Sequence, residues 1–126
     1  MKKNLFIPIL YMMPLLLIIT LVMSCGKNAK EGTVYWDDGT IAYVGELKDG
    51  AFQGKGTYYY GDGSISYKGE FQNGMFHGKG TFYNKDGTIG YEGEFKDGLF
   101  HGKGTAYRED GTIIYEGEFK EGMRVD

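Results

Sequence analysis

The stretch YKGEFQNGMFHGKGTFYNKDGTIG, from Tyr67 to Gly90, recurs along nearly all of the chain after residue 31. Moving it by 24 residues in either direction places it on a matching segment. Successive copies open at Tyr43, Tyr67, Tyr91 and Tyr115. The repeated positions hold 19 of the 22 glycines in the 126-residue chain, so the glycine content reflects a repeat and not low complexity. A fixed period of this length indicates an array in which each unit packs on its neighbours.

Each copy has the pattern of two β-strands. From Ile65 to Phe71, apolar residues and glycine alternate with Ser66, Lys68 and Glu70, which is the period of a strand. Asp-Gly pairs such as Asp86-Gly87 follow each second arm, and they are typical of tight hairpin turns that need residues with positive φ. No stretch after residue 25 has helical periodicity. The sequence therefore predicts an all-β fold, a single-layer, elongated antiparallel meander of about eight strands built of repeated hairpins.

A two-residue loop at Asp86-Gly87 sets the expected register. It places Phe82 opposite Tyr91, Gly80 opposite Gly93 and Lys79 opposite Glu94. The neighbouring turns repeat the charged pair as Lys55–Glu70 and Lys103–Glu118. We expect each exposed pair to contribute a few tenths of a kcal/mol at most. Glycines that face one another beside aromatic rings leave slots in which Tyr or Phe lies flat against the backbone.

The unit resembles the MORN repeat, whose pattern is Y-x-G-x-F-x-x-G-x-x-x-G-x-G. The match is close in YKGEFQNGMFHGKG (67–80) and YEGEFKDGLFHGKG (91–104) and looser in YVGELKDGAFQGKG (43–56). The domains expected on this basis are a half copy at 32–42, full copies at 43–66, 67–90 and 91–114, and a partial copy at 115–126. The resemblance implies a scaffold for protein interaction or self-assembly. Binding of membrane-lipid headgroups has also been proposed for such repeats.

Residues 1–24 have the layout of a secretory signal. Lys2 and Lys3 precede an almost wholly apolar run from Leu5 to Met23. The boundary Leu21-Val22-Met23-Ser24-Cys25 resembles a bacterial lipobox, which implies cleavage before Cys25, the single cysteine, and its acylation. Two other interpretations stay open: an uncleaved transmembrane helix, which Pro8 and Pro14 would interrupt, or an unmodified thiol.

Whether residues 1–24 are a lipoprotein signal or an uncleaved transmembrane helix, the positively charged end at Lys2 and Lys3 stays in the cytoplasm. We therefore expect an exported protein of the cell envelope whose repeats face away from the cytoplasm. Residues 25–31 are polar and predict a tether. Removing residues 1–24 changes the formal charge from −3 to −5, which disfavours nucleic acid as a partner.

Nothing in the repeats indicates catalysis, a cofactor or a small-molecule substrate. His77 and His101 lie one repeat, or two strands, apart, so about 9.5 Å separates them, too far for one metal ion. No histidine is placed to activate Ser64 or Ser66. The glutamates opposite the lysines indicate a solvated charge ladder and not a pair of catalytic carboxylates. The glycine motifs begin strands, whereas a phosphate-binding loop precedes a helix whose N-terminus faces the phosphate.

A single layer leaves one aromatic face without a cover. We therefore expect a binding face made of Tyr43, Tyr67, Phe71, Phe82, Tyr91, Phe95, Tyr115 and Phe119, with Tyr58 in the same row. The predicted function is a non-catalytic, lipid-anchored scaffold whose partner is another protein or a second copy. Alternatives are glycan or cell-wall binding through exposed aromatic rings, and lipid headgroup binding through Lys55, Lys79 and Lys103, a basic row that the facing glutamates would neutralise.

Overall fold

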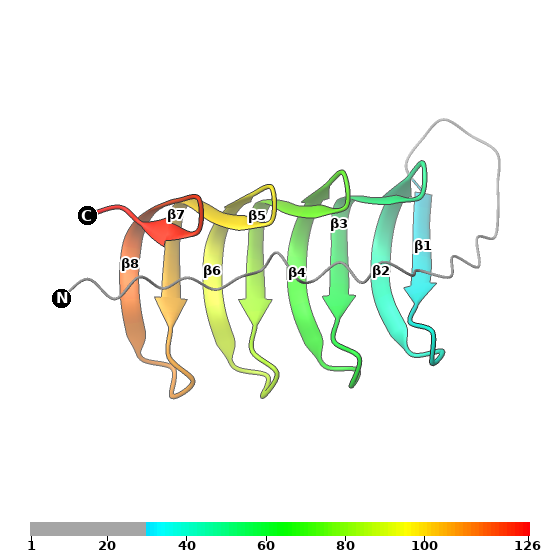
Figure 1. The fold of residues 1–126 in the computed structure, drawn as a ribbon, viewed down its shortest axis with the longest axis horizontal. Helices are drawn as coiled ribbons and strands as arrows, with labels where there is room; N and C mark the ends of the chain where they lie inside the picture. The colour runs from blue at the N-terminus through cyan, green and yellow to red at the C-terminus, as the bar shows by residue number, and fades with distance from the viewer. Residues whose placement is uncertain (1–29) are drawn as a thin grey trace.

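The computed structural model describes residues 30–126, so residues 1–29, including the predicted signal segment and Cys25, lie outside the description. Within residues 30–126 the chain forms one antiparallel sheet of nine strands in sequence order, with no helix, which confirms the predicted all-β meander (Figure 1). The strands are β1 (Lys30–Tyr35), β2 (Ile41–Lys48), β3 (Ala51–Tyr59), β4 (Ile65–Gln72), β5 (Met75–Tyr83), β6 (Ile89–Lys96), β7 (Leu99–Tyr107), β8 (Ile113–Lys120) and β9 (Met123–Arg124). Because β1 begins at Lys30, the last two residues of the predicted tether belong to the sheet.

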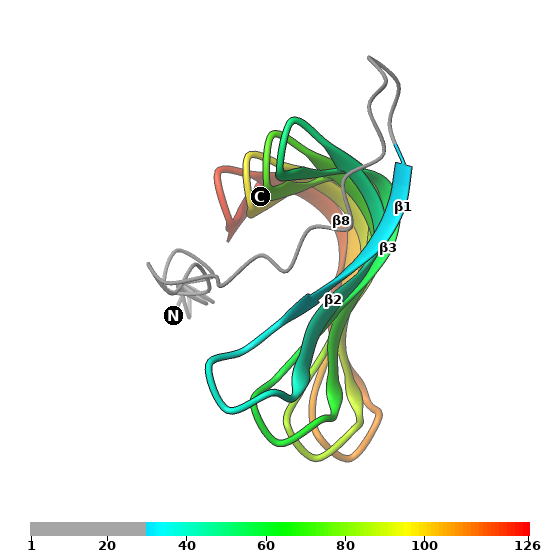
Figure 2. The same ribbon diagram turned by 90° about the vertical axis from the view of Figure 1, so that its right-hand side faces the viewer.

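The strands curve strongly, so that the sheet is a trough with hairpin turns along both rims (Figure 2). On the concave side of such a sheet the side chains of neighbouring strands converge. The buried aromatic rings that form the core alternate along the strands with the exposed residues of the convex side, so they lie on the concave side. The convex side carries the alternate residues of each strand, including Lys68, Lys79 and Glu94. The two faces of one sheet therefore have different compositions.

The predicted register is confirmed, but the predicted turn is wrong. Phe82 pairs with Tyr91, Gly80 with Gly93 and Lys79 with Glu94, as expected. The loop is nevertheless longer than two residues, because the Gly87 amide donates to the Asn84 carbonyl and the Asn84 amide donates to the Thr88 carbonyl. The register then shifts between Phe82 and Tyr83. A bulge in the following strand absorbs one residue, and this offsets the longer loop.

The tight two-residue turns lie at the opposite rim. Gln72 pairs with Met75 around Asn73-Gly74, whose φ angles are 51° and 80°. Positive φ at both central residues is the requirement of a type I′ hairpin. At the other rim, only Gly87 of the Asp86-Gly87 pair has positive φ. Asp86 instead accepts hydrogen bonds from the Thr88 amide (2.9 Å) and hydroxyl (2.6 Å), which closes the longer turn.

The bulge changes which residues face the core. Ser66 is fully buried beside Tyr67, whereas Ile65 is 36% exposed, although strict alternation predicts the reverse. Gly90 is likewise buried and Ile89 is exposed. The extra residue puts two consecutive side chains on the core side, and the isoleucine before them then lies on the convex face.

The glycine slots exist as predicted. A Cβ atom added to Gly93 would lie 2.5 Å from the Gly104 Cα and 2.6 Å from the Lys103 carbonyl oxygen. A Cβ atom on Gly80 would overlap the ring and the hydroxyl of Tyr67. The tyrosine ring thus occupies the space that a side chain at the glycine would need, and its hydroxyl donates to the Glu70 carbonyl oxygen at 2.9 Å.

Candidate interaction surface

The concave row predicted as a binding face is not exposed. Seven of its eight residues are buried and the eighth is half-buried: Tyr43, Tyr67, Phe71, Phe82, Tyr91, Phe95 and Phe119 are buried, and Tyr115 is half-buried. The expectation of a bare aromatic face is therefore wrong, and the reason lies in residues that the sequence analysis left out of the row. Phe52, Phe76 and Phe100 begin the second arm of each repeat and complete the cover.

Tyr67 shows how a single layer buries its own rings. Phe76 stacks on the Tyr67 ring with centroids 3.9 Å apart, and Phe71 and Phe95 meet it edge to face at 5.1 and 5.0 Å. These three rings come from β5, β4 and β6, so each tyrosine is enclosed by its own strand and its neighbours. Because the trough brings the side chains together, the sheet needs no second layer to bury its core.

Burial also sets the protonation of the core tyrosines. Desolvation raises the pKa of Tyr43, Tyr67 and Tyr91 well above the ordinary value, and raises the pKa of Tyr58 to about 12. Their hydroxyls therefore stay protonated at neutral pH. Those of Tyr43, Tyr67 and Tyr91 donate to carbonyl oxygens in their own strands. This row belongs to the fold.

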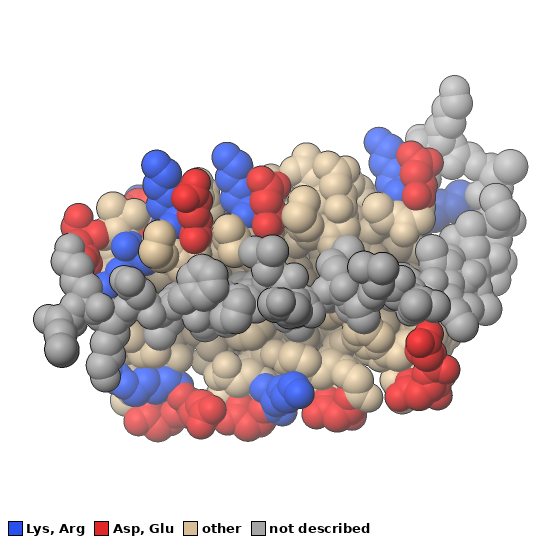
Figure 3. All heavy atoms as spheres, in the orientation of Figure 1, with Lys and Arg blue, Asp and Glu red and all other residues tan. Residues whose placement is uncertain are grey.

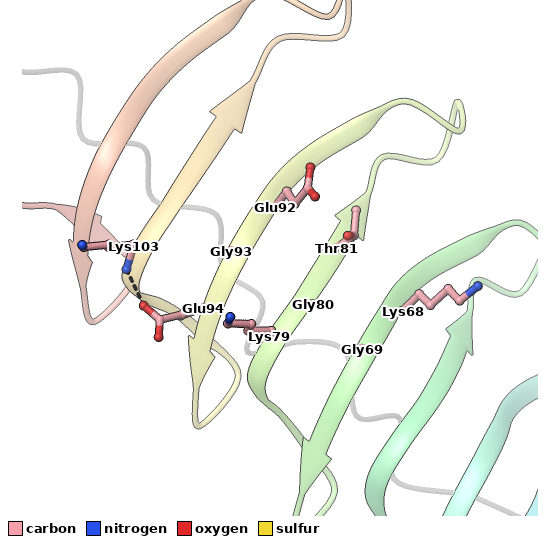
Figure 4. Close-up of a pocket in the computed structure, with 9 residues that line it drawn as sticks. All are labelled: Lys68, Gly69, Lys79, Gly80, Thr81, Glu92, Gly93, Glu94 and Lys103. Carbon is pink, nitrogen blue, oxygen red and sulfur yellow. Dashed lines mark hydrogen bonds between the residues drawn. The ribbon is translucent and has the colours of Figure 1, made fainter.

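The charge ladder on the convex face is arranged differently from the expectation. Lys79 and Glu94 are opposite in register, but within residues 30–126 no ion pair joins them. Instead, Glu94 Oε2 accepts a hydrogen bond from the backbone amide of Lys103 at 2.6 Å (Figure 4). Glu70 Oε2 accepts the equivalent bond from the Lys79 amide. The glutamates thus accept hydrogen bonds from backbone amides near the register shift that follows each tight turn.

A shallow depression lies between these charged rows, where successive glycines leave the backbone bare (Figure 4). Lys68, Lys79 and Lys103 line it together with Glu92 and Glu94. The mixed charges and the open shape give it no preference for an ion of either sign. We assign it no ligand.

The convex face carries a second aromatic row that the sequence analysis missed. Each second-arm strand ends in a tyrosine paired with the isoleucine that begins the next strand, and we call this row the Tyr–Ile stripe. It consists of Tyr35–Ile41, Tyr59–Ile65, Tyr83–Ile89 and Tyr107–Ile113. The isoleucines are 36–52% exposed, Tyr35 is 38% exposed, and the other tyrosines are half-buried. The stripe crosses the sheet at right angles to the strands.

A sequence signal for the stripe exists. Tyr35, Tyr59, Tyr83 and Tyr107 recur every 24 residues, and the last three follow the core positions Tyr58, Phe82 and Ala106 directly. Neighbouring residues in a strand point to opposite faces, so a buried position implies an outward neighbour. For the isoleucines the signal was misleading, since the bulge was not foreseen.

Charged side chains gather along both rims of the trough (Figure 3). The rim beside the stripe, at the bottom of Figures 1 and 3, is rich in carboxylates, and we call these residues the acidic edge. The acidic edge consists of Asp37, Asp38, Asp62, Asp86, Glu109 and Asp110, with Lys85 and Arg108 as cations of the same turns. Hydrogen bonds from Thr88 hold the pKa of Asp86 below its ordinary value, and Asp38, Asp62 and Asp110 have equivalent partners. These carboxylates are therefore charged at neutral pH.

The two histidines lie on separate strands of the sheet. His77 on β5 and His101 on β7 are half-buried, and their carbonyl oxygens lie 3.4 Å from the hydroxyls of Tyr67 and Tyr91. Across residues 30–126 no group of three His, Cys, Asp or Glu side chains could hold a metal ion. In the same range there is no helix with the length and apolarity needed to cross a bilayer. Cys25 lies outside the described residues.

Taken together, these features describe an elongated single-sheet repeat protein with a self-contained aromatic core and one ordered row of exposed side chains. The model of the MORN repeat family matches residues 43–65, 67–89, 91–113 and 115–125. The chain belongs to the MORN repeat family, since these segments cover more than half of it. A comparison with curated proteins found no match. MORN repeats generally serve as protein- or membrane-interaction modules.

Proposed function

We propose that this chain is an exported, lipid-anchored and non-catalytic MORN-repeat scaffold that binds another protein through the convex Tyr–Ile stripe. The observation that carries the proposal is the exposure of the stripe: four isoleucines are 36–52% exposed at equivalent places of successive repeats. A regular apolar row of this length is more than scattered surface residues, and such rows mark interaction sites.

The contrast with the concave row supports the choice of surface. The rings of the concave row are buried by contacts with other aromatic rings of the core, as the stacking of Phe76 on Tyr67 illustrates. The tyrosines of the stripe make no ring–ring contact within residues 30–126. Tyrosine on a protein surface supplies a large rigid contact area and a hydroxyl for hydrogen bonding, which makes it a frequent anchor of interfaces.

Export and anchoring are supported by the sequence alone. The order of Lys2-Lys3, the apolar run Leu5–Met23 and Ser24-Cys25 matches a signal segment followed by a lipobox. Acylation of Cys25 would hold the repeats at a membrane surface, with residues 26–29 as a short link to β1. In this arrangement the stripe faces partners in the cell envelope.

Glycan binding is a second candidate, because the stripe exposes tyrosine rings on which sugars could stack. Each tyrosine is paired with an isoleucine, however, and a branched aliphatic side chain offers no hydrogen bond to sugar hydroxyls. This pairing favours a polypeptide partner. Retention of the chain on insoluble cell-wall polysaccharide, lost on changing the stripe, would favour the glycan.

The test of the binding face is cross-linking in the native cell followed by mass spectrometry. The variant is Tyr59→Ser together with Tyr83→Ser, and the matched control is Lys79→Ser with Lys103→Ser on the same convex face. We expect the wild type and the control to capture the same protein, and the stripe variant to lose it while circular dichroism shows an intact sheet. Capture by the stripe variant at the wild-type level would refute this surface.

The anchor is tested separately with Cys25→Ala. We expect this variant to leave the membrane fraction or to accumulate with its signal segment uncleaved. A Cys25→Ala protein that stays membrane-bound at unchanged mass would show that Leu5–Met23 acts as an uncleaved transmembrane helix.

A further inference from the structure

We propose that the Tyr–Ile stripe binds a proline-rich polypeptide segment in the polyproline II conformation, with basic residues of that segment beside the acidic edge. This inference rests on the proposed function, since it names the chemistry of the partner at the same surface. Three features of this surface support it: the spacing of the stripe, the chemistry of its side chains and the charge beside it.

The spacing of the stripe matches the period of a polyproline II helix. Tyr59, Tyr83 and Tyr107 occupy the same place on every second strand, and two strand spacings are about 9.4–9.8 Å. A polyproline II helix rises about 3.1 Å per residue with three residues per turn, so it repeats every ~9.3 Å. One ligand turn per structural repeat therefore brings an equivalent residue to each Tyr–Ile pair.

An α-helix fits this spacing less well. Its seven-residue face repeat rises about 10.5 Å, which exceeds the spacing of the stripe by roughly 1 Å per repeat. Over the three steps from Tyr35 to Tyr107 the mismatch grows to ~3 Å, whereas that of polyproline II stays below ~2 Å. A straight helix would lose contact with the outer pairs.

The side chains of the stripe suit the same ligand. Proline rings are apolar and stiff, and aromatic-lined grooves bind them because the extended conformation is already formed before binding. The isoleucine of each pair adds an apolar wall beside the tyrosine, as Ile89 does beside Tyr83. The carbonyl groups of polyproline II have no internal partner and accept hydrogen bonds. Within residues 30–126 the hydroxyls of Tyr59, Tyr83 and Tyr107 make no hydrogen bond, so they are available as donors.

The charge beside the stripe gives the ligand a preferred composition. The acidic edge places six carboxylates along the rim that adjoins the stripe, against the two cations Lys85 and Arg108. The segment that binds is therefore expected to carry arginine or lysine next to its prolines, and acidic residues at those places would be repelled. Electrostatic attraction of this exposed kind weakens as salt is added.

The test uses the full chain in detergent and a fluorescent peptide of twelve consecutive prolines flanked by two arginines, long enough to span about 37 Å. Fluorescence anisotropy measures binding to the wild type, to the Tyr59→Ser/Tyr83→Ser variant and to the Lys79→Ser/Lys103→Ser control. A Gly-Ser peptide with the same arginines tests the need for proline. The proline peptide with two glutamates in place of the arginines tests the charge.

We expect saturable binding of the arginine-flanked proline peptide that is at least about tenfold weaker with the stripe variant and within about twofold of wild type with the control. The Gly-Ser and glutamate-flanked peptides should bind at least about tenfold more weakly than the arginine-flanked peptide. Equal binding of the proline and Gly-Ser peptides, or equal binding by the wild type and the stripe variant, would overturn the inference. So would stripe-dependent binding of a cell-wall oligosaccharide, or of a second copy in sedimentation, without binding of the peptide.

The two proposals fail separately. If the peptide does not bind but the native partner is still captured in a stripe-dependent manner, the scaffold function stands and the polyproline ligand is wrong. If capture in the cell does not depend on the stripe, the proposed function falls and the peptide result decides only whether this surface has affinity for proline-rich sequence.

Discussion

Tyr67 and Tyr83 belong to the same repeat and lie on opposite faces of the same sheet. Tyr67 is fully buried, stacked on Phe76 and bonded to the Glu70 carbonyl oxygen. Tyr83 ends β5 on the convex side, paired with the exposed Ile89. The difference comes from their positions in the strands, because neighbouring residues of a strand point to opposite faces. Tyr67 points to the core side, whereas Tyr83 directly follows the buried Phe82 and points away from it. Recurrence of an aromatic residue in a repeat therefore does not tell a core position from a position on the opposite face.

The largest expected change in stability comes from removing the Tyr67 ring, and removal of the Tyr83 ring is the comparison. We expect Tyr67→Ala to lower the free energy of unfolding by about 3–5 kcal/mol, because it removes a fully buried ring from a stacked cluster. Tyr83→Ala should cost less than ~1 kcal/mol, because Tyr83 is only half-buried and makes no ring–ring contact within residues 30–126. Denaturant titration of the full chain measures both. Equal costs would mean that the convex row is also part of the core.

The next test fills a slot under a ring. Gly93→Val places a branched side chain where a Cβ atom alone comes within 2.5 Å of the Gly104 Cα and 2.6 Å of the Lys103 carbonyl oxygen. We expect a loss of about 1–3 kcal/mol. Thr81→Val places a valine on the convex face where a branched side chain of similar size already stands, and it should change stability by less than ~0.5 kcal/mol. A neutral Gly93→Val would show that the slot is not needed.

A smaller effect distinguishes the two possible partners of Glu94. Its carboxylate accepts from the Lys103 amide, so Glu94→Ala should cost about 1–2 kcal/mol, and Glu94→Gln, which keeps an oxygen acceptor, less than ~1 kcal/mol. Lys79→Gln should cost no more than a few tenths of a kcal/mol, although Lys79 faces Glu94 in register. A larger cost for Lys79→Gln than for Glu94→Ala would restore the cross-strand ion pair as the main interaction.

The smallest effect concerns the turns of the acidic edge. Hydrogen bonds from the Thr88 hydroxyl and amide lower the pKa of Asp86 from 3.8, so the folded state binds its proton less readily than the unfolded state. The stability from this bond is present above pH 3.8 and is lost as the pH falls through the lower folded value. The denaturant midpoint should therefore fall on acidification, and fall less in Thr88→Val. An identical acid response of Thr88→Val and wild type would show that other carboxylates cause the loss.

Much of this fold followed from the sequence because the repeat fixes its own register. The 24-residue period, the alternation in each arm and the glycine pairs together predicted the sheet order and the facing residues Gly80 and Gly93. The type of turn at Asp86-Gly87 did not follow. An Asp-Gly pair is compatible with several types of loop. The longer loop with a bulge gives the same strand pairing from Phe82–Tyr91 onward as a two-residue loop would, so the pairing does not reveal the turn type.

The candidate site is where the sequence alone was insufficient. The alternation of side chains along each strand separates the two rows of tyrosines onto opposite faces of the sheet. It does not show which row is exposed, because burial depends on the curvature of the sheet and on the rings of neighbouring strands. Phe76 from β5 and Phe95 from β6 close over Tyr67, which is a contact between strands and not within one. The sequence by itself determined a one-sheet array of repeated hairpins. The tertiary structure decided that the concave rings bury one another and that the isoleucines of the Tyr–Ile stripe are exposed, because only the curved sheet brings side chains of several strands together on one face.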